Sequence, residues 1–258
     1  MKVVILAGGL GTRLMEETES RPKPMVEIGG KPILWHIMKI YEAQGYNDFI
    51  ICLGYKGHMI KEYFLNYYLY NSDVTIELEK NKVDVHFSNS ESFKVTLIDT
   101  GINTNTAGRI KRIQKYTKNE TFMLTYGDGL SNIDLNKLIE QHRISKKYAT
   151  LTAIQIPGRF GHLDINETGI VGNFQEKPKT DGLWINGGFF VLEPQIFNYL
   201  DGDMDMIQWE MQPLMKIAAD GQLASYSHRG FWKAMDAMRD RIELEELWKS
   251  NQAEWKIW

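Results

Sequence analysis

The sequence predicts an α/β protein: a Rossmann-like, mixed and mostly parallel sheet flanked by helices, with an inserted β-hairpin and a C-terminal helical tail. Residues 3–7 form a wholly apolar run, the pattern of a parallel strand buried on both faces. Residues 31–44 carry apolar side chains at helical spacing and end at Gly45, and residues 49–53 form a second apolar run. Strand, helix and strand in this order make the parallel crossover unit of α/β folds.

The whole chain, residues 1–258, is expected to form a single domain. Its 258 residues are enough for one sizeable core, and no internal repeat or low-complexity linker divides them. A net charge of −3 with mixed signs argues against a nucleic-acid-binding surface. No N-terminal export segment and no membrane-spanning apolar run is evident in the sequence, so we expect a cytoplasmic protein.

A glycine-rich segment follows the first strand. It runs from Leu6 to Arg13 with the sequence L-A-G-G-L-G-T-R. Glycine permits positive φ and removes the Cβ, so backbone N–H groups can approach phosphate oxygens. Arg13 adds a bidentate cation. The segment therefore predicts a site for a polyphosphate.

Lys23 lies between Pro22 and Pro24, and a residue before proline is restricted to extended backbone conformations. This restriction would aim the lysine at little entropic cost, whereas the alternative is an ordinary glycine turn with solvated charges. Two other phosphate motifs fail: Leu14 replaces the last glycine of a dinucleotide fingerprint, and Gly11-Thr12-Arg13 is not the end of a P-loop. Neither a dehydrogenase nor a P-loop NTPase is favoured.

The next segments alternate between buried and half-exposed patterns. Cys52 lies in the apolar run 49–53, so we expect a buried structural thiol, and a single cysteine excludes a disulfide within the chain. Residues 57–69 are expected to form a helix. Residues 74–79 and 83–87 alternate apolar and polar side chains, which predicts a hairpin over residues 74–87. We expect this insertion to cover the site or a neighbouring subunit, and His86 on it to be a solvated strand residue.

Two later strands end in candidate ligand loops. Residues 95–99 lead into a polar loop, 99–109, and then a helix starting at Ile110; loops at the carboxyl edge of parallel strands bind ligands. Residues 122–126 lead into Gly127-Asp128-Gly129. Asp128 suits a Mg²⁺ ion, which takes one or two carboxylates together with substrate phosphate oxygens. The alternative is an aspartate in a tight turn.

The last third supplies further strands, at residues 149–156 and 184–191, and a terminal helix with its tail, 240–258. Lys177 precedes a proline, as Lys23 does, and His228 is expected to be structural. The tail carries Trp248, Trp255 and Trp258, a large apolar surface that docks on its own domain or on another subunit. We expect a homo-oligomer, with a hexamer among the candidates, built through the hairpin or this tail.

The motif L-A-G-G-x-G-T-R-L followed by P-K-P-M resembles the signature of the sugar-nucleotide pyrophosphorylase (nucleotidyltransferase) family. The resemblance covers nearly the whole chain and includes R-P-K-P-M-V-E-I-G-G-K-P-I-L-W-H-I-M, T-Y-G-D-G-x-S-N, W-I-N-G-G-F-F-V, E-x-L-W and W-K-x-W. It implies an enzyme that joins CTP and α-D-glucose 1-phosphate into CDP-glucose and pyrophosphate, usually on the way to deoxysugars of surface polysaccharides. Two alternatives stay open: a sibling enzyme using UTP, dTTP, GTP or mannose 1-phosphate, and a non-catalytic regulatory homologue.

The resemblance also implies roles for individual residues. The catalytic pair is Arg13 and Lys23, and Asp128 and Asp236 would hold Mg²⁺. The nucleotide would meet Leu6, Ala7, Gly8, Gly9, Leu10, Gly11, Thr12, Arg13, Lys23, Thr104, Thr106, Gly108, Arg109 and Asp128. The sugar phosphate would meet Gly127, Glu176, Lys177, Asn186 and Gly187. Two residues depart from the family pattern: Ala107 replaces a glycine of T-x-T-G-G-R, and Ala237 stands where threonine is common.

The chemistry expected from these residues is an in-line displacement. A sugar phosphate must attack the α-phosphorus of the nucleotide, and two like unit charges about 4 Å apart repel by about 4 kcal/mol at an effective dielectric near 20. Mg²⁺ and Lys23 would offset this repulsion, while residues 8–11 and Arg13 hold the departing pyrophosphate. A phosphate monoester is already ionised at neutral pH, so no general base is required. Backbone groups of residues 6–11 and 99–109 are expected to select cytosine.

Overall fold

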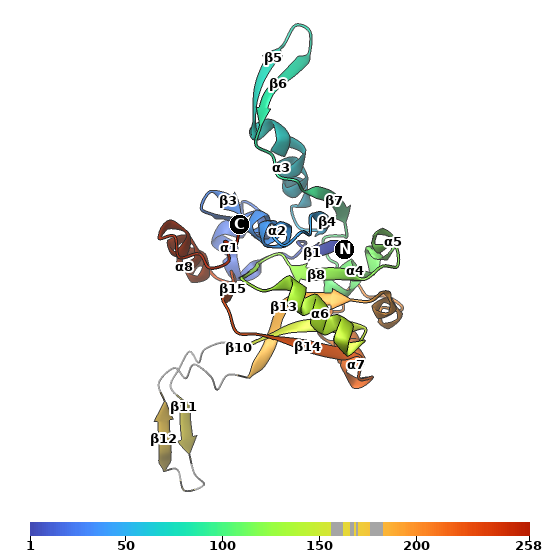
Figure 1. Cartoon of the computed structure of the whole chain (residues 1–258), viewed down its shortest axis with the longest axis vertical. Helices are drawn as coiled ribbons and strands as arrows, with labels where there is room; N and C mark the ends of the chain where they lie inside the picture. The colour runs from blue at the N-terminus through green and yellow to red at the C-terminus, as the bar shows by residue number, and fades with distance from the viewer. Residues whose placement is uncertain (156–161, 166–167, 169, 176–182) are drawn as a thin grey trace.

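The central sheet places four parallel strand ends at one edge of the molecule. The computed structural model describes residues 1–155, 162–165, 168, 170–175 and 183–258 (Figure 1). Its seven-stranded sheet has the order β14-β10-β13-β8-β1-β4-β7. These strands are β1 (Val3–Leu6), β4 (Asp48–Leu53), β7 (Lys94–Asp99), β8 (Phe122–Tyr126), β10 (Ala149–Gln155), β13 (Trp184–Leu192) and β14 (Leu223–His228). Strands β8, β1, β4 and β7 are mutually parallel, which confirms the predicted fold class.

Strand β13 runs against its neighbours β8 and β10. Its amino-terminal residues therefore lie at the edge where the parallel strands end. The register with β10 shifts between Leu151 and Ala153, and such a bulge turns side chains out of the regular alternation. Asn186 and Gly187 are brought by this geometry to the same edge as the glycine-rich segment.

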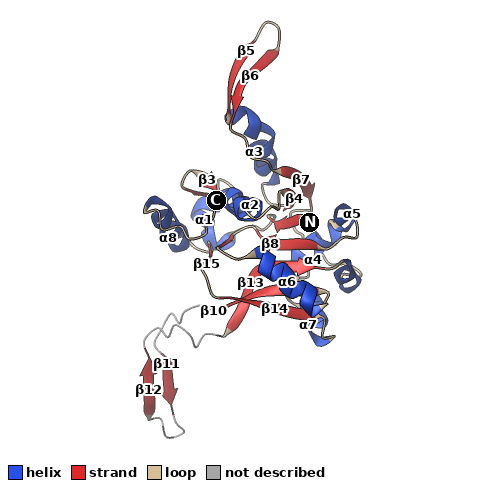
Figure 2. Ribbon diagram, in the orientation of Figure 1, coloured by secondary structure: helices blue, strands red, loops and turns tan. Residues whose placement is uncertain are grey.

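Helices cover both faces of the sheet (Figure 2). They are α1 (Met15–Thr18), α2 (Ile33–Glu42), α3 (Gly57–Tyr70), α4 (Thr106–Arg112), α5 (Gln114–Thr117), α6 (Leu135–Ser145), α7 (Gln212–Ala219) and α8 (Met238–Lys249). Short 3₁₀ turns occupy Thr12–Leu14, Lys23–Met25 and Pro194–Tyr199.

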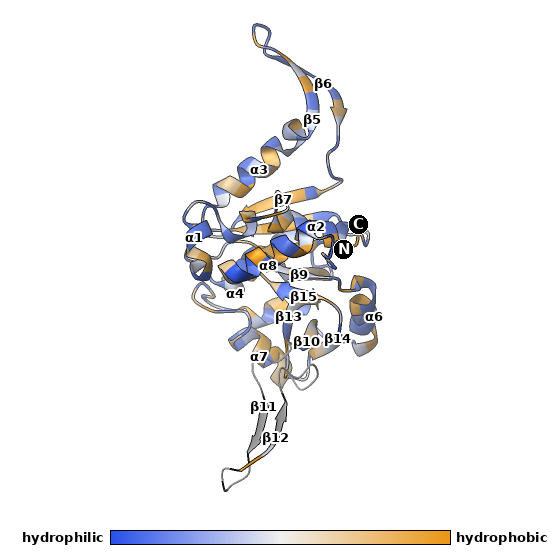
Figure 3. Ribbon diagram, turned by 90° about the vertical axis from the view of Figure 1, so that its left-hand side faces the viewer, coloured by the Kyte–Doolittle hydropathy of each residue, from blue (hydrophilic) through white to orange (hydrophobic). Residues whose placement is uncertain are grey.

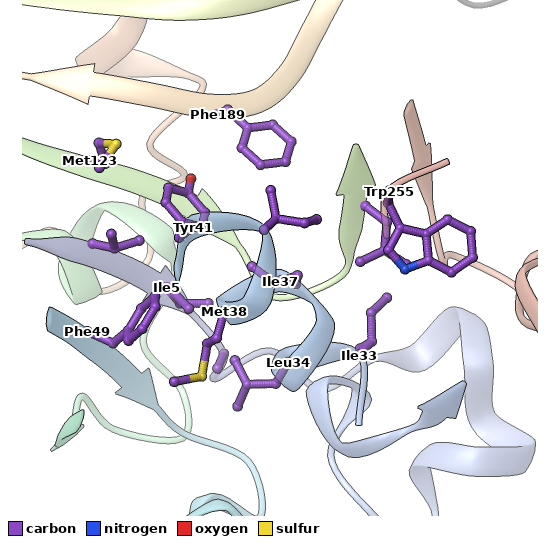
Figure 4. Close-up of a cluster of buried hydrophobic side chains, with 14 of the residues drawn as sticks. Ile5, Ile33, Leu34, Ile37, Met38, Tyr41, Phe49, Met123, Phe189 and Trp255 are labelled. Carbon is purple, nitrogen blue, oxygen red and sulfur yellow. The ribbon is translucent and has the colours of Figure 1, made fainter. Parts of the chain in front are cut away.

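Two hydrophobic clusters follow from the alternation of side chains along the buried strands. Val3 and Ile5 point into the cluster under α2 and α6, while Val4 and Leu6 point into the cluster under α4 and α7. Figure 4 shows Leu34, Ile37 and other α2 side chains in the cluster under α2 and α6. Both faces of β1 are thus dry, as its continuous apolar run predicts. Cys52 is fully buried, and burial raises the pKa of its thiol to about 12.

Four two-stranded ribbons complete the fold of the described residues. They are β2 (Glu27–Ile28) with β3 (Lys31–Pro32), β5 (Ser72–Glu77) with β6 (Lys82–Ser88), β9 (Gly129–Ser131) with β15 (Trp232–Ala234), and β11 (His162–Ile165) with β12 (Val171–Gln175). The β5–β6 ribbon confirms the predicted inserted hairpin. The β11–β12 ribbon was not predicted from the sequence.

We call residues 57–88 the arm. Helix α3 and the β5–β6 hairpin extend away from the sheet (Figure 1), and apolar and polar residues alternate along the hairpin (Figure 3). Large apolar side chains on the arm face solvent: Leu65 is 77% exposed, Tyr70 79%, Leu78 87% and Phe87 63%. His86 is exposed and pairs with Thr75 across the hairpin at 2.8 Å, as expected for a solvated strand residue.

The C-terminal tail docks on its own domain. Trp248, Trp255 and Trp258 surround the buried ring of His36, with ring centroids 4.8, 6.2 and 6.1 Å from it. The His36 Nε2–H donates to the Ile28 carbonyl at 2.8 Å. Of the two alternatives for the tryptophan tail, the structure shows docking on its own domain. In the part of the chain that the structure describes, no helix has the length and apolar character to cross a bilayer.

Candidate active site

A cavity of about 310 Å³ lies at the carboxyl ends of the parallel strands. It gathers segments that are far apart in the sequence. The lining residues are Leu6, Gly9, Gly11, Thr12, Arg13, Lys23, Pro24, Thr104, Asn105, Thr106, Arg109, Tyr126, Gly127, Asp128 and Asp236. Most of the nucleotide residues expected from the sequence are thus brought together.

The glycines of the loop after β1 have different tasks. Gly8 is buried, and its carbonyl accepts from Tyr55 N at 3.1 Å and from Arg109 Nη2 at 2.8 Å. A Cβ on Gly8 would lie 2.1 Å from the guanidinium of Arg109, so a side chain at this position would displace that guanidinium. Gly11 has a φ of 66°, which favours glycine. Gly9 has no neighbour within 4 Å of an added Cβ and leaves its backbone open towards a ligand.

Lys23 is held between two carboxylates. Its Nζ lies 2.6 Å from Asp128 Oδ2 and 2.9 Å from Asp236 Oδ1. Arg13 Nη1 lies 3.3 Å from Asp236 Oδ2. Burial opposes the charge on Lys23, but the carboxylates outweigh it and raise the pKa of Lys23 above its usual value. The lysine is therefore a cation at neutral pH.

The backbone of Lys23 differs from the expected extended conformation. Lys23 begins a 3₁₀ turn, closed by Met25 N donating to Pro22 O at 2.8 Å and Val26 N donating to Lys23 O at 3.1 Å. These bonds offset the steric preference of a residue before proline. Pro24 fits the turn because its position requires no N–H donor.

Asp128 reaches the cavity because the residues on either side of it, Gly127 and Gly129, have no side chains. Gly127 N donates to Leu6 O at 3.0 Å, and a Cβ on Gly127 would lie 2.9 Å from that oxygen. The backbone of β8 can follow β1 this closely only without a side chain. The carboxylate of Asp128 therefore lies beside the glycine loop, just after the end of β8.

Asp236 is brought beside Asp128 by the ribbon β9–β15, in which Ala234 pairs with Gly129. Met235 N donates to the carbonyl of Asp128 at 2.9 Å. Asp240 Oδ2 accepts from Asp236 N at 3.1 Å and from Ala237 N at 2.9 Å. The carboxylate of Asp240 thus caps α8 and fixes the backbone of Asp236, a role that the sequence analysis did not assign.

The donor set fits a hard divalent cation. Asp128 and Asp236 offer carboxylate oxygens on either side of Lys23. Among the residues that the structure describes, no cluster of three or more His, Cys, Asp and Glu side chains could hold a metal ion. Two carboxylates with room for substrate phosphate oxygens are a donor set that such a cation takes in proteins.

Of the residues expected to meet the base, Thr106, Gly108 and Arg109 lie in the first turn of α4, which begins at Thr106 instead of Ile110, and Thr104 lies in the loop before it. Arg109 is buried, and Nη1 donates to Leu53 O, Thr100 Oγ1 and Gly101 O at 2.7–2.9 Å. Its expected contact with the nucleotide is thus accompanied by a second task, because the guanidinium ties the glycine loop to the ends of β4 and β7.

Gly108 packs against other parts of the protein. A Cβ there would lie 2.6 Å from Thr104 Cγ2 and 3.0 Å from Met204 O. Thr104 Oγ1 accepts from Arg112. Gly108 therefore allows α4 to lie close to the loop before it, while Thr104 and Thr106 line the cavity.

A second cavity, of about 230 Å³, adjoins the first. Its lining includes Asn186, Gly187 and Trp232. Trp232 Nε1 donates to Gly187 O at 2.7 Å, and Gly188 N donates to Asn186 Oδ1 at 2.8 Å. Glu176 and Lys177, also expected at the sugar phosphate, lie outside the described residues.

Comparison with known proteins identifies the class. Residues 2–240 match the family model of nucleotidyl transferases, and the chain belongs to this family, as the sequence motifs predicted. Enzymes of the family typically use a divalent metal ion.

Particular relatives are more informative. The chain is 55% identical to the glucose-1-phosphate cytidylyltransferase of Salmonella typhi, over 100% of both chains. It is 48% identical to the probable glucose-1-phosphate cytidylyltransferase of Bacillus subtilis (strain 168), again over 100% of both. The crystal structure of HddC from Yersinia pseudotuberculosis is similar with a TM-score of 0.69 and 28% identity, over 96% of this chain and 99% of that one.

Proposed function

We propose that the protein transfers a cytidylyl group from CTP to α-D-glucose 1-phosphate, forming CDP-glucose and releasing pyrophosphate. The observation that carries this proposal is the charged cluster of Arg13, Lys23, Asp128 and Asp236 beside the glycine loop. A non-catalytic homologue would have no need to keep all four. The choice of CTP and glucose is supported by full-length relatives named for these substrates.

Asp128 and Asp236 would hold Mg²⁺, which when bound supplies positive charge to the phosphate oxygens. Lys23 neutralises charge that develops on the α-phosphate. Arg13 and the backbone N–H groups from Gly8 to Gly11 bind the pyrophosphate. The attacking phosphate monoester is already ionised, so the protein contributes position and charge and needs no general base.

The two cavities divide the substrates. We assign the nucleotide to the larger one, lined by Leu6, Thr104, Thr106 and Arg109 among others. The sugar phosphate is assigned to the smaller one, with Asn186 and Gly187. Asp128 and Asp236 line both cavities, so the reacting phosphates would meet between these carboxylates. Glu176 and Lys177 retain the sugar-phosphate role given to them by the sequence motifs.

We also propose a homo-oligomer, with a hexamer among the candidate assemblies, built through the arm. Side chains such as Leu78 and Phe87 are more than half exposed there. Exposed apolar side chains gathered along one element mark an interaction surface more often than single scattered ones do. The tryptophan tail is already packed on its own domain, which leaves the arm as the proposed contact.

The test is pyrophosphate release with CTP, UTP, dTTP and GTP at equal concentration, fixed glucose 1-phosphate, and with or without Mg²⁺. One backbone acceptor facing the cytosine amino group gives about a tenfold to hundredfold preference, because a mismatched base leaves it unpaired. We therefore expect CTP to have the highest kcat/KM by at least about tenfold. Equal kcat/KM for UTP would retain the enzyme class and discard the cytidylyl assignment. No release with any nucleotide would favour the non-catalytic alternative.

A further inference from the structure

Tyr126, the last residue of β8, separates the two cavities and lines both of them. Its hydroxyl donates to Glu210 Oε1 and accepts from Asn186 Nδ2 at 3.3 Å. Its ring packs on Gly188, where an added Cβ would lie only 2.6 Å from Tyr126 Cδ2. The Tyr126 hydroxyl thus contacts Asn186 at the proposed sugar site, whereas Glu210 lines neither cavity.

Glu210 extends the contact to the nucleotide side. Its second oxygen, Oε2, accepts from Thr106 Oγ1 at 3.1 Å, and Thr106 Oγ1 accepts in turn from Trp209 N at 2.7 Å. Thr106 is the first residue of α4 and lines the larger cavity. A single carboxylate therefore joins the start of α4 to β8, and through Tyr126 to β13.

The direction of each hydrogen bond is fixed. An ionised carboxylate only accepts, so Tyr126 and Thr106 must both donate to Glu210. The one proton of the Tyr126 hydroxyl is thus directed at Glu210. The phenol oxygen is left as the acceptor for Asn186 Nδ2, and Asn186 Oδ1 then accepts from Gly188 N at 2.8 Å. The Asn186 amide consequently has one orientation.

We propose that Glu210 is a positioning residue for both substrates, orienting Asn186 for the sugar phosphate through Tyr126 and fixing the start of α4 for the nucleotide through Thr106. The inference rests on the proposed function for the identity of the substrates. It adds a residue that none of the sequence motifs singled out.

Four variants separate the two branches of this network. Tyr126→Phe removes the acceptor of Asn186 Nδ2 and leaves Thr106 bonded to Glu210. Thr106→Ala removes the other branch, and Thr106→Ser restores its hydroxyl. Glu210→Gln has one acceptor and one donor in place of two acceptors, so it cannot receive both hydroxyls.

The expected result is a split in KM values. Tyr126→Phe should raise KM for glucose 1-phosphate about tenfold with KM for CTP near the wild-type value, since an unpaired polar group is left at the sugar site. Thr106→Ala should raise KM for CTP by a similar factor, and Thr106→Ser should restore it. Glu210→Gln should raise both. Equal effects of Tyr126→Phe on both substrates, or no effect of Glu210→Gln on either, would overturn the proposal.

A matched control is Glu193→Gln, at the other end of β13. Glu193 also accepts from a threonine hydroxyl, Thr121 Oγ1 at 2.8 Å, and from His142 at 3.0 Å, away from both cavities. This variant should change thermal stability without altering either KM. Two assays separate this proposal from the proposed function. A wild type without turnover of CTP in the pyrophosphate assay contradicts the proposed function. Calorimetric dissociation constants for CTP, UTP and glucose 1-phosphate that are unchanged in Glu210→Gln contradict the network.

Discussion

Replacing Lys23 by alanine should remove the charge that the proposed mechanism depends on most. The ammonium is held by Asp128 at 2.6 Å and Asp236 at 2.9 Å, inside the cavity that lies beside the glycine loop. Alanine leaves the 3₁₀ turn intact, because its closing bonds involve backbone atoms of Pro22, Lys23, Met25 and Val26. The change therefore removes charge with little change of shape.

The size of the effect follows from Coulomb's law. A unit charge about 4 Å from a phosphate oxygen contributes about 4 kcal/mol at an effective dielectric near 20. Each factor of ten in rate corresponds to about 1.4 kcal/mol, so complete loss of this term slows turnover about a thousandfold. Partial replacement by water makes about a hundredfold the smallest loss expected.

The assay is kcat for pyrophosphate release, with folding checked by circular dichroism. Lys31→Ala is the matched control, because Lys31 also precedes a proline but lies over the rings of Trp35 and Tyr67, at 5.7 and 5.9 Å. A near-normal kcat in folded Lys23→Ala would remove Lys23 from the mechanism. Manganese binding gives a second readout: without nucleotide, Lys23→Ala should bind Mn²⁺ more tightly than wild type, and Asp128→Asn more weakly, since lysine and metal share the same carboxylates.

Three further predictions concern the supports of the site, the assembly and the pH range. Asp240→Ala should lower kcat about tenfold by freeing the backbone of Asp236, and Asp240→Asn, which keeps an acceptor, should lose less; equal losses would contradict the capping role. Phe87→Asp with Leu78→Asp should reduce the mass found by light scattering, and a wild type that is already a monomer at micromolar concentration would refute the arm as an interface. Burial lowers the pKa of His36 from 6.5 to about 4, so the unfolded chain binds more protons between these values, and the free energy of unfolding should fall by about 3 kcal/mol as pH drops from 6.5 to 4. The free energy of unfolding of His36→Asn, measured from denaturation curves, should change less with pH over this range. A pH dependence equal to that of the wild type would refute the assignment.

The elements that the sequence predicts well are those with local signals. The apolar runs of β1 and β4, the helical spacing of α2, and the glycines around Asp128 are each contained in fewer than fifteen residues. The apolar pattern of a strand or helix reflects which of its faces are buried, and this pattern can be recognised without knowing where the element lies in the sheet. The glycine loop and Asp128 were found for this reason.

The partners of these residues are not local. Glu210 meets Tyr126 across 84 positions and Thr106 across 104, so no spacing in the sequence reveals either contact. The reversal of β13 is equally hidden, since an apolar run has the same composition in either direction. Lys23 shows a third limit: backbone hydrogen bonds overrode the preference of a residue before proline.

Ala107 illustrates how a departure from the family pattern is absorbed. A glycine at this position suggests a positive φ, but Ala107 lies in the first turn of α4, buried, with its N–H donating to Ile207 O at 3.1 Å. Alanine stabilises a helix relative to glycine by about 1 kcal/mol. The close approach instead depends on Gly108, beside Thr104. The substitution therefore favours the helix without filling the cavity.

Ala237 is absorbed differently, because a carboxylate inside the last helix holds the chain that enters it. A threonine here would offer its hydroxyl to the N–H groups at the start of α8, the usual task of an N-cap side chain. Ala237 keeps the extended backbone of an N-cap, with φ of −134° and ψ of 167°, but has no oxygen to offer. Asp240, in the first turn of α8, accepts from the backbone N–H groups of Ala237 and Asp236, so the chain entering the helix is held although the N-cap side chain offers no acceptor. Because that same carboxylate holds the residue proposed to bind the metal, loss of Asp240 should cost more activity here than in relatives that carry threonine at the cap.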